Sequence, residues 1–577
     1  MMQVMKENSE WIKETIGRLT TEQKAGQLVI LGMNGTVLTP DMTELIRDYH
    51  VGGIRISMKA RHTTLATLHS YARPGDQHDD MTLKSVHHPA GLCKDLSFTN
   101  HPPVLTTGQY AEFLNCLRSY VEPSSGAIPV HFVIDQEGNG TDDLLGGARL
   151  FPYPLGLAST NDPELIYRAG LAVGRQAAAC GINTVQAVLD VNTNINNPEI
   201  GPRSFGNNAD DVIRCATQFF RGLKDGGVSA VGKHFAGRGE STADAHWGLP
   251  VMDVPLDELE NTHIRPFGAL AEAGLLPGIM VAHCIYPALG ESKLPATLSP
   301  RILKDYIRGK MGYRGVLVTD NMMMGGIIKQ YEMTDAIIMS LQAGIDMVLC
   351  RDESPVRQVI LKRIAEAIRS GLLPETEVDE KLARILAMRC DMGLLNNNGL
   401  VDSENAEKIV HDPVILETAR EAAEKSVQVL RDRAGVLPLA ADAKVLLIEQ
   451  AFVTQIAANN ADSHPGLLWE ELSRIGRHVA CVEIADLPPE ADIERVRRRL
   501  RSEDFDVIVT TNYFHYKVGG SINGLVEEFI ATGKPVIVLA NNPFPFCVGD
   551  SFDTVLLNYQ PAGREYMRAT AALIFGK

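Results

Sequence analysis

Eight short apolar runs, separated by segments of helical period, occupy most of the chain between residues 27 and 350. This alternation is typical of βα units around a parallel sheet. Eight units in succession predict an α/β protein with a TIM-like (β/α)8 barrel, in which chemistry takes place at the carboxyl ends of the strands. The predicted strands are 27–32, 53–57, 130–134, 184–187, 230–233, 278–282, 315–319 and 347–350, and the predicted helices include 163–180, 209–225 and 256–273.

A second pattern begins after the polar stretch 396–399, which has the composition of a linker. We therefore predict a catalytic barrel over 1–400 and a smaller three-layer α/β sandwich domain over 401–577. Its predicted strands are 444–448, 507–510, 536–540 and 555–558, with helices such as 493–501 between them. The sequence of this domain has no GxGxxG after a strand and no Walker loop, so we predict no bound nucleotide.

Residues 58–104 interrupt the barrel rhythm, because they follow the second strand with few periodic apolar positions. We interpret them as an inserted loop on the catalytic face that narrows the range of substrates. This segment contains six of the sixteen histidines of the chain: His62, His69, His78, His87, His88 and His101. No HxH or HExxH spacing occurs among them, so we predict no metal site.

Charge and composition exclude several classes of protein. The 577 residues include 71 acidic and 55 basic ones, a net charge of -16 that disfavours a nucleic-acid partner. No apolar run approaches the roughly 20 residues that span a bilayer, and the charged amino terminus lacks the apolar core of a secretory signal. The nine cysteines include no CxxC pair. We expect a cytoplasmic protein with reduced thiols and no membrane partner, and we make no prediction of its oligomeric state.

The stretch 232–250 runs from an apolar strand into a loop rich in glycine and charge. We expect this loop to be mobile and wet. Asp244 precedes His246 by two residues, so an extended backbone would place both side chains on one side. The carboxylate could then orient an imidazole, whose ordinary pKa of about 6.5 suits proton transfer near neutrality. The alternative is an Asp that caps the next segment beside a solvated His.

Asp320 follows the apolar run 316–318 and is therefore predicted at the barrel mouth. A carboxylate at a strand end can attack an anomeric carbon if it is ionised, and we expect Lys233 to help keep it so. The alternative is the N-cap of the following helix, a position that Asp favours.

Polar side chains also follow other strands. Asp135, Arg203, Lys233 and His234 all lie at or beyond predicted strand ends. Carboxylates that accept two bonds and cations that donate several are the groups that bind vicinal sugar hydroxyls. Lys233 and His234 could instead satisfy local carboxylates.

Several short motifs occur in a fixed order along nearly the whole chain. They are Leu19-Thr20-Thr21-Glu22-Gln23-Lys24, Val51-Gly52-Gly53-Ile54, Asp135-Gln136-Glu137-Gly138, Phe151-Pro152, Arg203-Ser204-Phe205-Gly206, Lys233-His234-Phe235, Asp244-Ala245-His246, His283 to Pro287, Pro295-Ala296-Thr297-Leu298-Ser299, Thr319-Asp320 and Ala343-Gly344-Ile345-Asp346. This ordered set resembles glycoside hydrolase family 3, and specifically its β-N-acetylglucosaminidase branch.

The resemblance implies a (β/α)8 barrel followed by an α/β sandwich. It implies Asp320 as the nucleophile and Asp244 with His246 as the acid/base dyad of a retaining hydrolase. Asp135, Arg203, Lys233 and His234 are expected to hold the non-reducing sugar. The implied substrate is a small carbohydrate with a terminal β-linked N-acetylhexosamine, such as a peptidoglycan fragment, and no metal or organic cofactor is implied.

The chain departs from the family pattern at a few positions. Asn139-Gly140 replace the usual Gly-Arg, Ala236 replaces Pro, Arg238 replaces His, and Asn321 replaces a common acidic residue. Three alternatives remain open: a family 3 β-N-acetylglucosaminide phosphorylase, a β-glucosidase, and a catalytically silent sugar-binding homologue. The presence of Asp320, Asp244 and His246 makes the silent homologue the least favoured of these.

Overall fold

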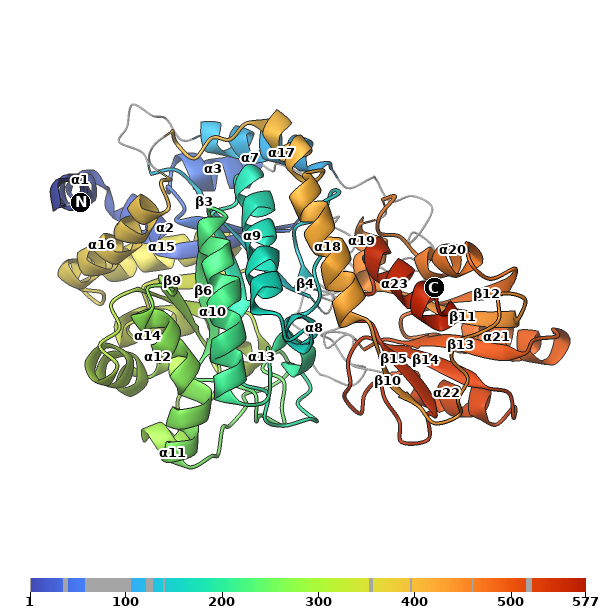
Figure 1. Cartoon of the computed structure of the whole chain (residues 1–577). Coiled ribbons are helices and arrows are strands. Elements are labelled where there is room, and N and C mark those ends of the chain that lie inside the picture. The colour runs from blue at the N-terminus through green and yellow to red at the C-terminus, as the bar shows by residue number, and fades with distance from the viewer. Residues whose placement is uncertain are drawn as a thin grey trace.

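The computed structural model describes residues 2–34, 40–57, 105–120, 128–138, 141–351, 356–394, 397–458, 460–514 and 521–577. The predicted insertion 58–104 with its six histidines lies outside the described residues, as do Asn139 and Gly140. Figure 1 shows two bodies, a barrel surrounded by helices and a second sheet flanked by helices near the carboxyl terminus.

The first body is a closed barrel of eight parallel strands. Its sheet order is β2-β1-β9-β8-β7-β6-β5-β3, and β2 also pairs with β3, which closes the ring. The short hairpin partner β4 (Thr141–Asp142) extends the end of β3. The barrel strands are β1 (Val29–Asn34), β2 (Gly53–Ser57), β3 (His131–Gly138), β5 (Thr184–Val188), β6 (Ser229–Phe235), β7 (Gly278–Val281), β8 (Val316–Asn321) and β9 (Met347–Cys350). The predicted fold and all eight predicted strands are confirmed.

Helical segments follow every barrel strand and cover the outside of the sheet (Figure 1). They are α3 (Pro40–Arg47), α7 (Thr107–Ser119), α8 (Pro154–Ser159), α9 (Pro163–Ala179), α10 (Ala209–Asp225), α11 (Leu256–Glu258), α12 (Arg265–Glu272), η6 (Arg301–Lys310), α13 (Gly325–Ile328), α14 (Met333–Ala343), α15 (Val356–Arg369) and α16 (Glu375–Asp391). Helices α1 (Met2–Arg18) and α2 (Thr21–Gln27) precede the barrel.

The predicted helix 256–273 is interrupted by a π-helical segment, η3 (Leu259–Ile264), between α11 and α12. Pro266, two residues after η3, cannot donate a backbone hydrogen bond, which disfavours an uninterrupted α-helix at this point.

The second sheet has six strands in the order β10-β15-β14-β13-β11-β12. The four central or near-central strands were predicted: β11 (Lys444–Ala451), β13 (Val507–Asn512), β14 (Val536–Ala540) and β15 (Thr554–Leu557). The two edge strands, β10 (Gln428–Asp432) and β12 (His478–Ala485), were missed. An edge strand faces solvent on one side, and Val429 and Leu430 of β10 are 40% and 42% exposed, so the continuous apolar run of a buried parallel strand is absent there.

Two separate apolar clusters cover the faces of this sheet. One joins it to α21 (Glu490–Ser502) and α22 (Asn523–Ile530), and the other joins it to α20 (Leu467–Ser473) and α23 (Arg564–Phe575). The second body is therefore the three-layer α/β sandwich that the sequence predicted. A further helix, α19 (Val453–Ala458), follows β11.

The two sheets lie on either side of the predicted boundary near residue 400, and that boundary stays a prediction. Helix α17 (Ser403–Ile409) contacts α7 and α9, and α18 (Pro413–Ser426) contacts both α9 of the barrel and α23 of the sandwich. In Figure 1, α18 runs along the junction of the two bodies.

One barrel residue belongs to the core of the sandwich. Tyr153, which directly precedes α8, is fully buried in the apolar cluster on the α21 and α22 face of the second sheet. Its backbone N–H donates to the carbonyl of Tyr559 at 3.0 Å, just after β15. The two bodies are therefore joined by both packing and backbone hydrogen bonding.

Among the described helices, none combines the length and apolar character that a membrane crossing requires. The eight described cysteines are all free thiols, and five of them are buried. The ninth, Cys93, lies outside the described residues.

We predict that Tyr153→Ala destabilises the folded chain by about 3–5 kcal/mol, the usual cost of truncating a buried aromatic side chain. Thermal unfolding of wild type and variant measures the change as a lower midpoint. Val359→Ala on α15 is the matched control, because Val359 is 53% exposed and its truncation should cost less than about 0.5 kcal/mol. Equal midpoints for wild type and Tyr153→Ala would contradict the shared core.

Candidate active site

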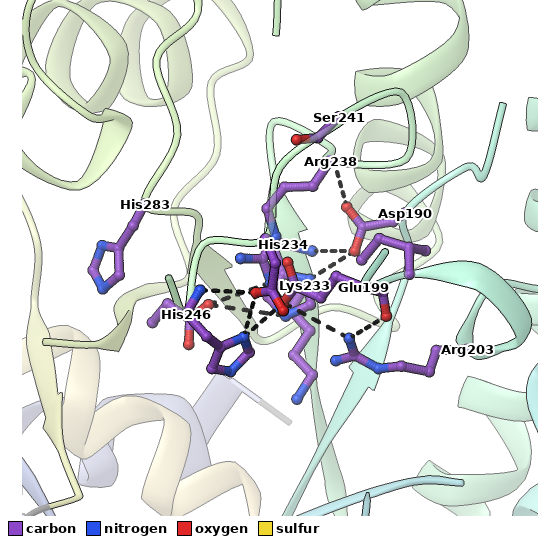
Figure 2. Close-up of polar contacts among 12 residues, drawn as sticks. Asp190, Glu199, Arg203, Lys233, His234, Arg238, Ser241, His246 and His283 are labelled. Atoms are coloured by element: carbon purple, nitrogen blue, oxygen red, sulfur yellow. Dashed lines mark hydrogen bonds and ion pairs between the residues drawn. The ribbon is translucent and has the colours of Figure 1, made fainter. Parts of the chain in front are cut away.

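Charged and polar side chains from three strands and one short helix meet at the carboxyl end of the barrel. Asp135 comes from β3, Lys233 and His234 from β6, and Asp320 from β8, while Arg203 belongs to the short helix η2 (Gly201–Arg203) beyond β5. Figure 2 shows the side chains of Arg203, Lys233, His234 and His246 gathered around one region. The barrel topology brings these residues together because parallel strands end on the same face.

Asp320 lies at the end of β8 with its side chain 13% exposed. Its Oδ1 accepts a hydrogen bond from the backbone N–H of Asn321 at 2.7 Å, and its Oδ2 lies 3.4 Å from Nη2 of Arg238. Burial alone would raise the pKa of Asp320, but Arg238 above all, with His283, His246 and the Asn321 N–H, holds it below its ordinary value. Asp320 is therefore an ionised carboxylate at the barrel mouth.

Two expectations about Asp320 change. The following helix, α13, has Met324 as its N-cap, so Asp320 does not cap it. The cation in contact with Asp320 is Arg238, where Lys233 was predicted. Lys233 instead donates to Asp135 and to Glu137.

Asp244 and His246 pair directly. The Oδ1 atom of Asp244 lies 2.7 Å from Nδ1 of His246 and also accepts the backbone N–H of His246 at 2.8 Å. The backbone here is a turn, in which Trp247 N–H donates to the Asp244 carbonyl, and not the predicted extended segment. Burial opposes ionisation of Asp244, but His246 outweighs it and holds the pKa of Asp244 below its ordinary value.

The predicted sugar-binding residues lie in a buried ion network. Nζ of Lys233 donates to Asp135 at 2.7 Å and to Glu137 at 2.6 Å, and Nε of Arg203 donates to Glu137 at 2.6 Å. Arg55 donates to Asp135 at 2.6 Å from the other side. Burial would raise the pKa of Asp135, but Lys233 and Arg55 hold it well below its ordinary value, so alternating charges compensate one another here.

His234 has a different partner from the rest of the predicted set. Its Nδ1 lies 2.7 Å from Oδ2 of Asp190, and its Nε2 lies 4.0 Å from Oδ2 of Asp320. Burial first, and then the positive charges of Arg238, Arg203 and Lys233, hold the pKa of His234 well below the ordinary value. His234 is therefore a neutral imidazole whose orientation is set by Asp190.

Asp190 also fixes the backbone of the loop that follows β6. Its oxygens accept the N–H of His234 at 3.1 Å and the N–H of Arg238 at 2.7 Å. The Lys233–His234 and Phe235–Ala236 peptide bonds in this segment are cis. Residues 236–239 are buried, so this part of the loop is not wet as expected, whereas Thr242 and Ala243 further along are exposed. A side chain at Gly239 would collide with the carbonyl of Val191, so its glycine allows close backbone packing.

His283 supports the backbone beyond Asp320. This buried histidine, two residues after β7, lies 2.9 Å from Oγ1 of Thr297 and 3.0 Å from the carbonyl oxygen of Asn321. Burial lowers the pKa of His283 to about 4, so the ring is neutral, and one ring N–H is available to donate to the Asn321 carbonyl.

Accessibility separates the cluster into two groups. The side chains of Asp135, Asp320 and His246 are 11%, 13% and 16% exposed. The side chains of Arg203, Lys233, His234, Glu137, Glu199, Arg238 and Asp190 are at most 4% exposed. A ligand that enters the barrel mouth can therefore reach one carboxylate from β3, one from β8 and the imidazole of the β6 loop.

The sequence analysis assigned no role to Asp190, Glu137 or Glu199. Asp190 lies two residues beyond the strand 184–188, and its position as a carboxylate just after an apolar strand is the same signal that singled out Asp320. Glu137 lies within the motif Asp135-Gln136-Glu137-Gly138 at the end of β3. Glu199 lies in a long connection after β5 with no strand or helix signal near it, so only the tertiary structure reveals its place beside His246.

Glu199, Asp244 and His246 each present one possible metal ligand, and these atoms lie within 4.8 Å of one another. Oε1 of Glu199 already contacts Nη2 of Arg238 at 2.9 Å, and Nδ1 of His246 already pairs with Asp244. A guanidinium beside the same oxygen repels a cation. These contacts favour an acid/base cluster over a metal centre.

Residues 20–388 match the family described as "Glycosyl hydrolase family 3 N terminal domain". This match covers more than half of the chain, and the chain belongs to glycosyl hydrolase family 3. Beta-hexosaminidase A of Pseudoalteromonas piscicida is 29% identical over 364 residues, which are 59% of this chain and 60% of that protein. Beta-hexosaminidase LpqI of Mycobacterium tuberculosis is 32% identical over 381 residues, which are 64% of this chain and 83% of that protein. The chain thus spans about three fifths of the length of the first of these relatives.

A solved structure shares the whole architecture. The family 3 β-N-acetylglucosaminidase from Paenibacillus sp. str. FPU-7 superposes with a TM-score of 0.76 at 27% identity, covering 97% of each chain. The likeness therefore includes both the barrel and the sandwich.

We predict a pH-dependent contribution of Asp190 to stability. Burial raises the pKa of Asp190 from 3.8 to about 6, so the folded state holds this proton more tightly than the unfolded chain does. The resulting stabilisation is complete below about pH 4 and is lost as the pH rises through about 6; its size is about 3 kcal/mol. The difference in unfolding free energy between wild type and Asp190→Asn should shrink over this interval.

Chemical denaturation of both proteins at a series of pH values measures this difference. Asp257→Asn, at an exposed position of α11, is the matched control for the substitution itself. A difference between wild type and Asp190→Asn that stays constant from pH 4 to 8 would contradict the prediction.

Proposed function

We propose that the protein is a retaining exo-β-N-acetylglucosaminidase that removes terminal β-linked N-acetylhexosamine from small carbohydrates. One observation carries this proposal: an ionised carboxylate, Asp320, and a carboxylate–imidazole pair, Asp244 with His246, belong to one cluster at the barrel mouth, joined through Arg238 and Glu199. The names of the hexosaminidase relatives and of the Paenibacillus structure support the choice of sugar.

In the first step of the proposed mechanism, Asp320 attacks the anomeric carbon. The bond from Oδ of Asp320 to C1 forms as the bond from C1 to the leaving oxygen breaks. His246 gives its proton to that oxygen, and Asp244 holds the imidazole through Nδ1, so Nε2 is the nitrogen that transfers the proton. The products are a glycosyl ester on Asp320, a neutral imidazole and the released aglycone.

In the second step, water attacks C1 of the ester while His246 takes one of its protons. The ester bond breaks and regenerates the Asp320 carboxylate and the imidazolium, so the catalyst returns to its starting state. Two inversions at C1 give net retention. The proposed chemistry requires neither a metal ion nor an organic cofactor.

The proposed sugar site uses the residues around these groups. Asp135 is exposed enough to accept hydrogen bonds directly from the sugar hydroxyls. Lys233 lies behind Asp135 and holds both Asp135 and Glu137 in place. Arg203 holds Glu137, and both cations place positive charge near the oxygens of the bound sugar. The neutral ring of His234, whose Nε2 lies 4.0 Å from Oδ2 of Asp320, can form a hydrogen bond with a hydroxyl of a sugar bound beside both residues.

Peptidoglycan fragments are the proposed natural substrates, because they carry N-acetylglucosamine in β linkage at a non-reducing end. The proposed location is the cytoplasm, which is consistent with the free thiols of the eight described cysteines.

A panel of chromogenic glycosides tests the proposed activity. We expect 4-nitrophenyl β-N-acetylglucosaminide to be cleaved at least about ten times more efficiently, by kcat/KM, than the β-glucoside or β-xyloside, a difference of about 1.4 kcal/mol in transition-state binding. Preference for the glucoside would identify a β-glucosidase, and no cleavage of any member would identify a silent homologue.

Product analysis separates hydrolysis from phosphorolysis. In phosphate buffer, water as acceptor gives free N-acetylglucosamine, whereas phosphate would give the sugar 1-phosphate from the same glycosyl ester. We expect the free sugar, and N-acetylglucosaminyl-N-acetylmuramic acid as substrate extends the same assay to the proposed natural linkage.

Asp320→Ala should lower kcat/KM by at least about 1,000-fold, because no group replaces the nucleophile, while the sugar still binds. A 5-fluoro N-acetylglucosaminyl fluoride, which slows breakdown of the ester, should leave a glycosyl mass on the wild-type peptide that contains Asp320. Asp253→Ala, at an exposed position, is the matched control and should be labelled like wild type. Near-normal turnover by Asp320→Ala, or label on another residue, would defeat the assignment.

A further inference from the structure

Two buried residues of opposite charge connect the proposed nucleophile to the proposed acid/base. Arg238 follows β6 and Glu199 lies in the connection after β5, and their side chains are 1% and 2% exposed. The backbone of Arg238 is fixed by Asp190, which accepts its N–H at 2.7 Å. The mechanism proposed above assigns no catalytic step to either residue.

The contacts form a continuous path. Nη2 of Arg238 lies 3.4 Å from Oδ2 of Asp320 and 2.9 Å from Oε1 of Glu199. The same Glu199 oxygen lies 3.5 Å from Nδ1 of His246, which also contacts Asp244. Arg238 thus places one positive charge beside two carboxylates, and Glu199 faces both this cation and the imidazole.

These contacts are interactions between charges and not aligned hydrogen bonds. None of the guanidinium nitrogens of Arg238, and not Oε1 of Glu199, makes a hydrogen bond of good geometry to a described residue. In a buried site, charges separated by 3 to 4 Å interact strongly without such alignment. Arg238 is the leading cause that keeps the pKa of Asp320 low against its burial. Burial raises the pKa of Glu199, and Arg238 opposes that rise.

We infer that Arg238 is a positioning residue shared by Asp320 and Glu199, and that Glu199 is a second carboxylate partner of His246, so that the charge of Asp320 influences proton transfer at His246. This inference rests on the proposed function. The charged and titratable groups that face this path are Asp244, Asp190, Arg203, His234, His283, Cys284 and Tyr286, besides the four residues that form it.

The coupling follows the charge changes of the two steps. When the ester forms, Asp320 loses its negative charge, and the positive charge of Arg238 is balanced by Glu199 alone. The surroundings of His246 become more positive, which favours the neutral imidazole needed to accept a proton from water. When the ester breaks, Asp320 is ionised again, and the imidazolium needed for the next turnover is favoured.

Two charge-removing variants test this inference, because they predict opposite shifts. Glu199→Gln removes a negative charge beside His246, so the imidazolium is less favoured and the basic limb of the kcat/KM pH profile moves to lower pH. Arg238→Gln removes a positive charge, so the basic limb moves to higher pH. The acidic limb also moves to higher pH, because Asp320 is less readily ionised. Each shift should be about 1–2 pH units, with kcat reduced about 10- to 100-fold and KM changed less.

Matched variants separate coupling from general disruption. Glu449→Gln makes the same substitution at a buried carboxylate of β11 in the second domain and should leave the profile unchanged. Arg238→Lys keeps the charge and should restore the basic limb toward wild type. The double variant Glu199→Gln with Arg238→Gln removes both charges and should return the basic limb toward its wild-type position. It therefore also tests the coupling where one of the single variants folds poorly.

A readout that does not depend on turnover keeps this test separate from the proposed function. The rate at which diethyl pyrocarbonate modifies His246, followed by peptide mass spectrometry, reports the neutral imidazole in each variant as a function of pH. If wild type cleaves no glycoside, the proposed function fails while this titration still tests the coupling. Shifts of the two single variants in the same direction, or no shift in either, would overturn the inference.

Discussion

Charged side chains removed from water cost free energy unless each faces a partner, and the mouth of this barrel meets that constraint by alternating their signs. The first chain of contacts is Arg55, Asp135, Lys233, Glu137 and Arg203. The second is Asp320, Arg238, Glu199, His246 and Asp244. Because neighbours compensate one another, the barrel can bury the ionised carboxylate of Asp320, the proposed nucleophile, where it has little water to stabilise it. The position of each charge then depends on all the others, and this arrangement needs a rigid scaffold.

The fold was largely predictable because its strands are buried on both faces. One apolar run such as 316–318 is ambiguous by itself. Eight such runs, separated by segments of helical period, indicate the strands of a parallel barrel. The same reasoning fails at the edges of the second sheet, where β10 and β12 expose part of their surface. The burial of residues 236–239, in the connection after β6, was not predicted for a related reason. Glycine and charge there indicated a wet loop, whereas they allow Gly239 and Arg238 to pack against the segment after β5.

The candidate site was predictable where a residue lies at or just beyond the carboxyl end of a strand. Asp135, Lys233, His234 and Asp320 were found in this way, and Asp190 could have been. Glu199 could not, because its place depends on the path of a long connection through space. The partners of each charge were also beyond the sequence. Arg238, and not Lys233, contacts Asp320, because the direction of each side chain from the end of β6 decides which carboxylate it meets.

The placement of Tyr153 has a consequence for how this architecture could have been assembled. A ring carried by the barrel segment completes the interior of the sandwich, and the backbone beside it is bonded to Tyr559. If the barrel were joined to an unrelated domain, the ring of Tyr153 would be exposed to water. The sandwich without this barrel would have a cavity in its core. The two units of this chain therefore constrain one another's sequence where they meet.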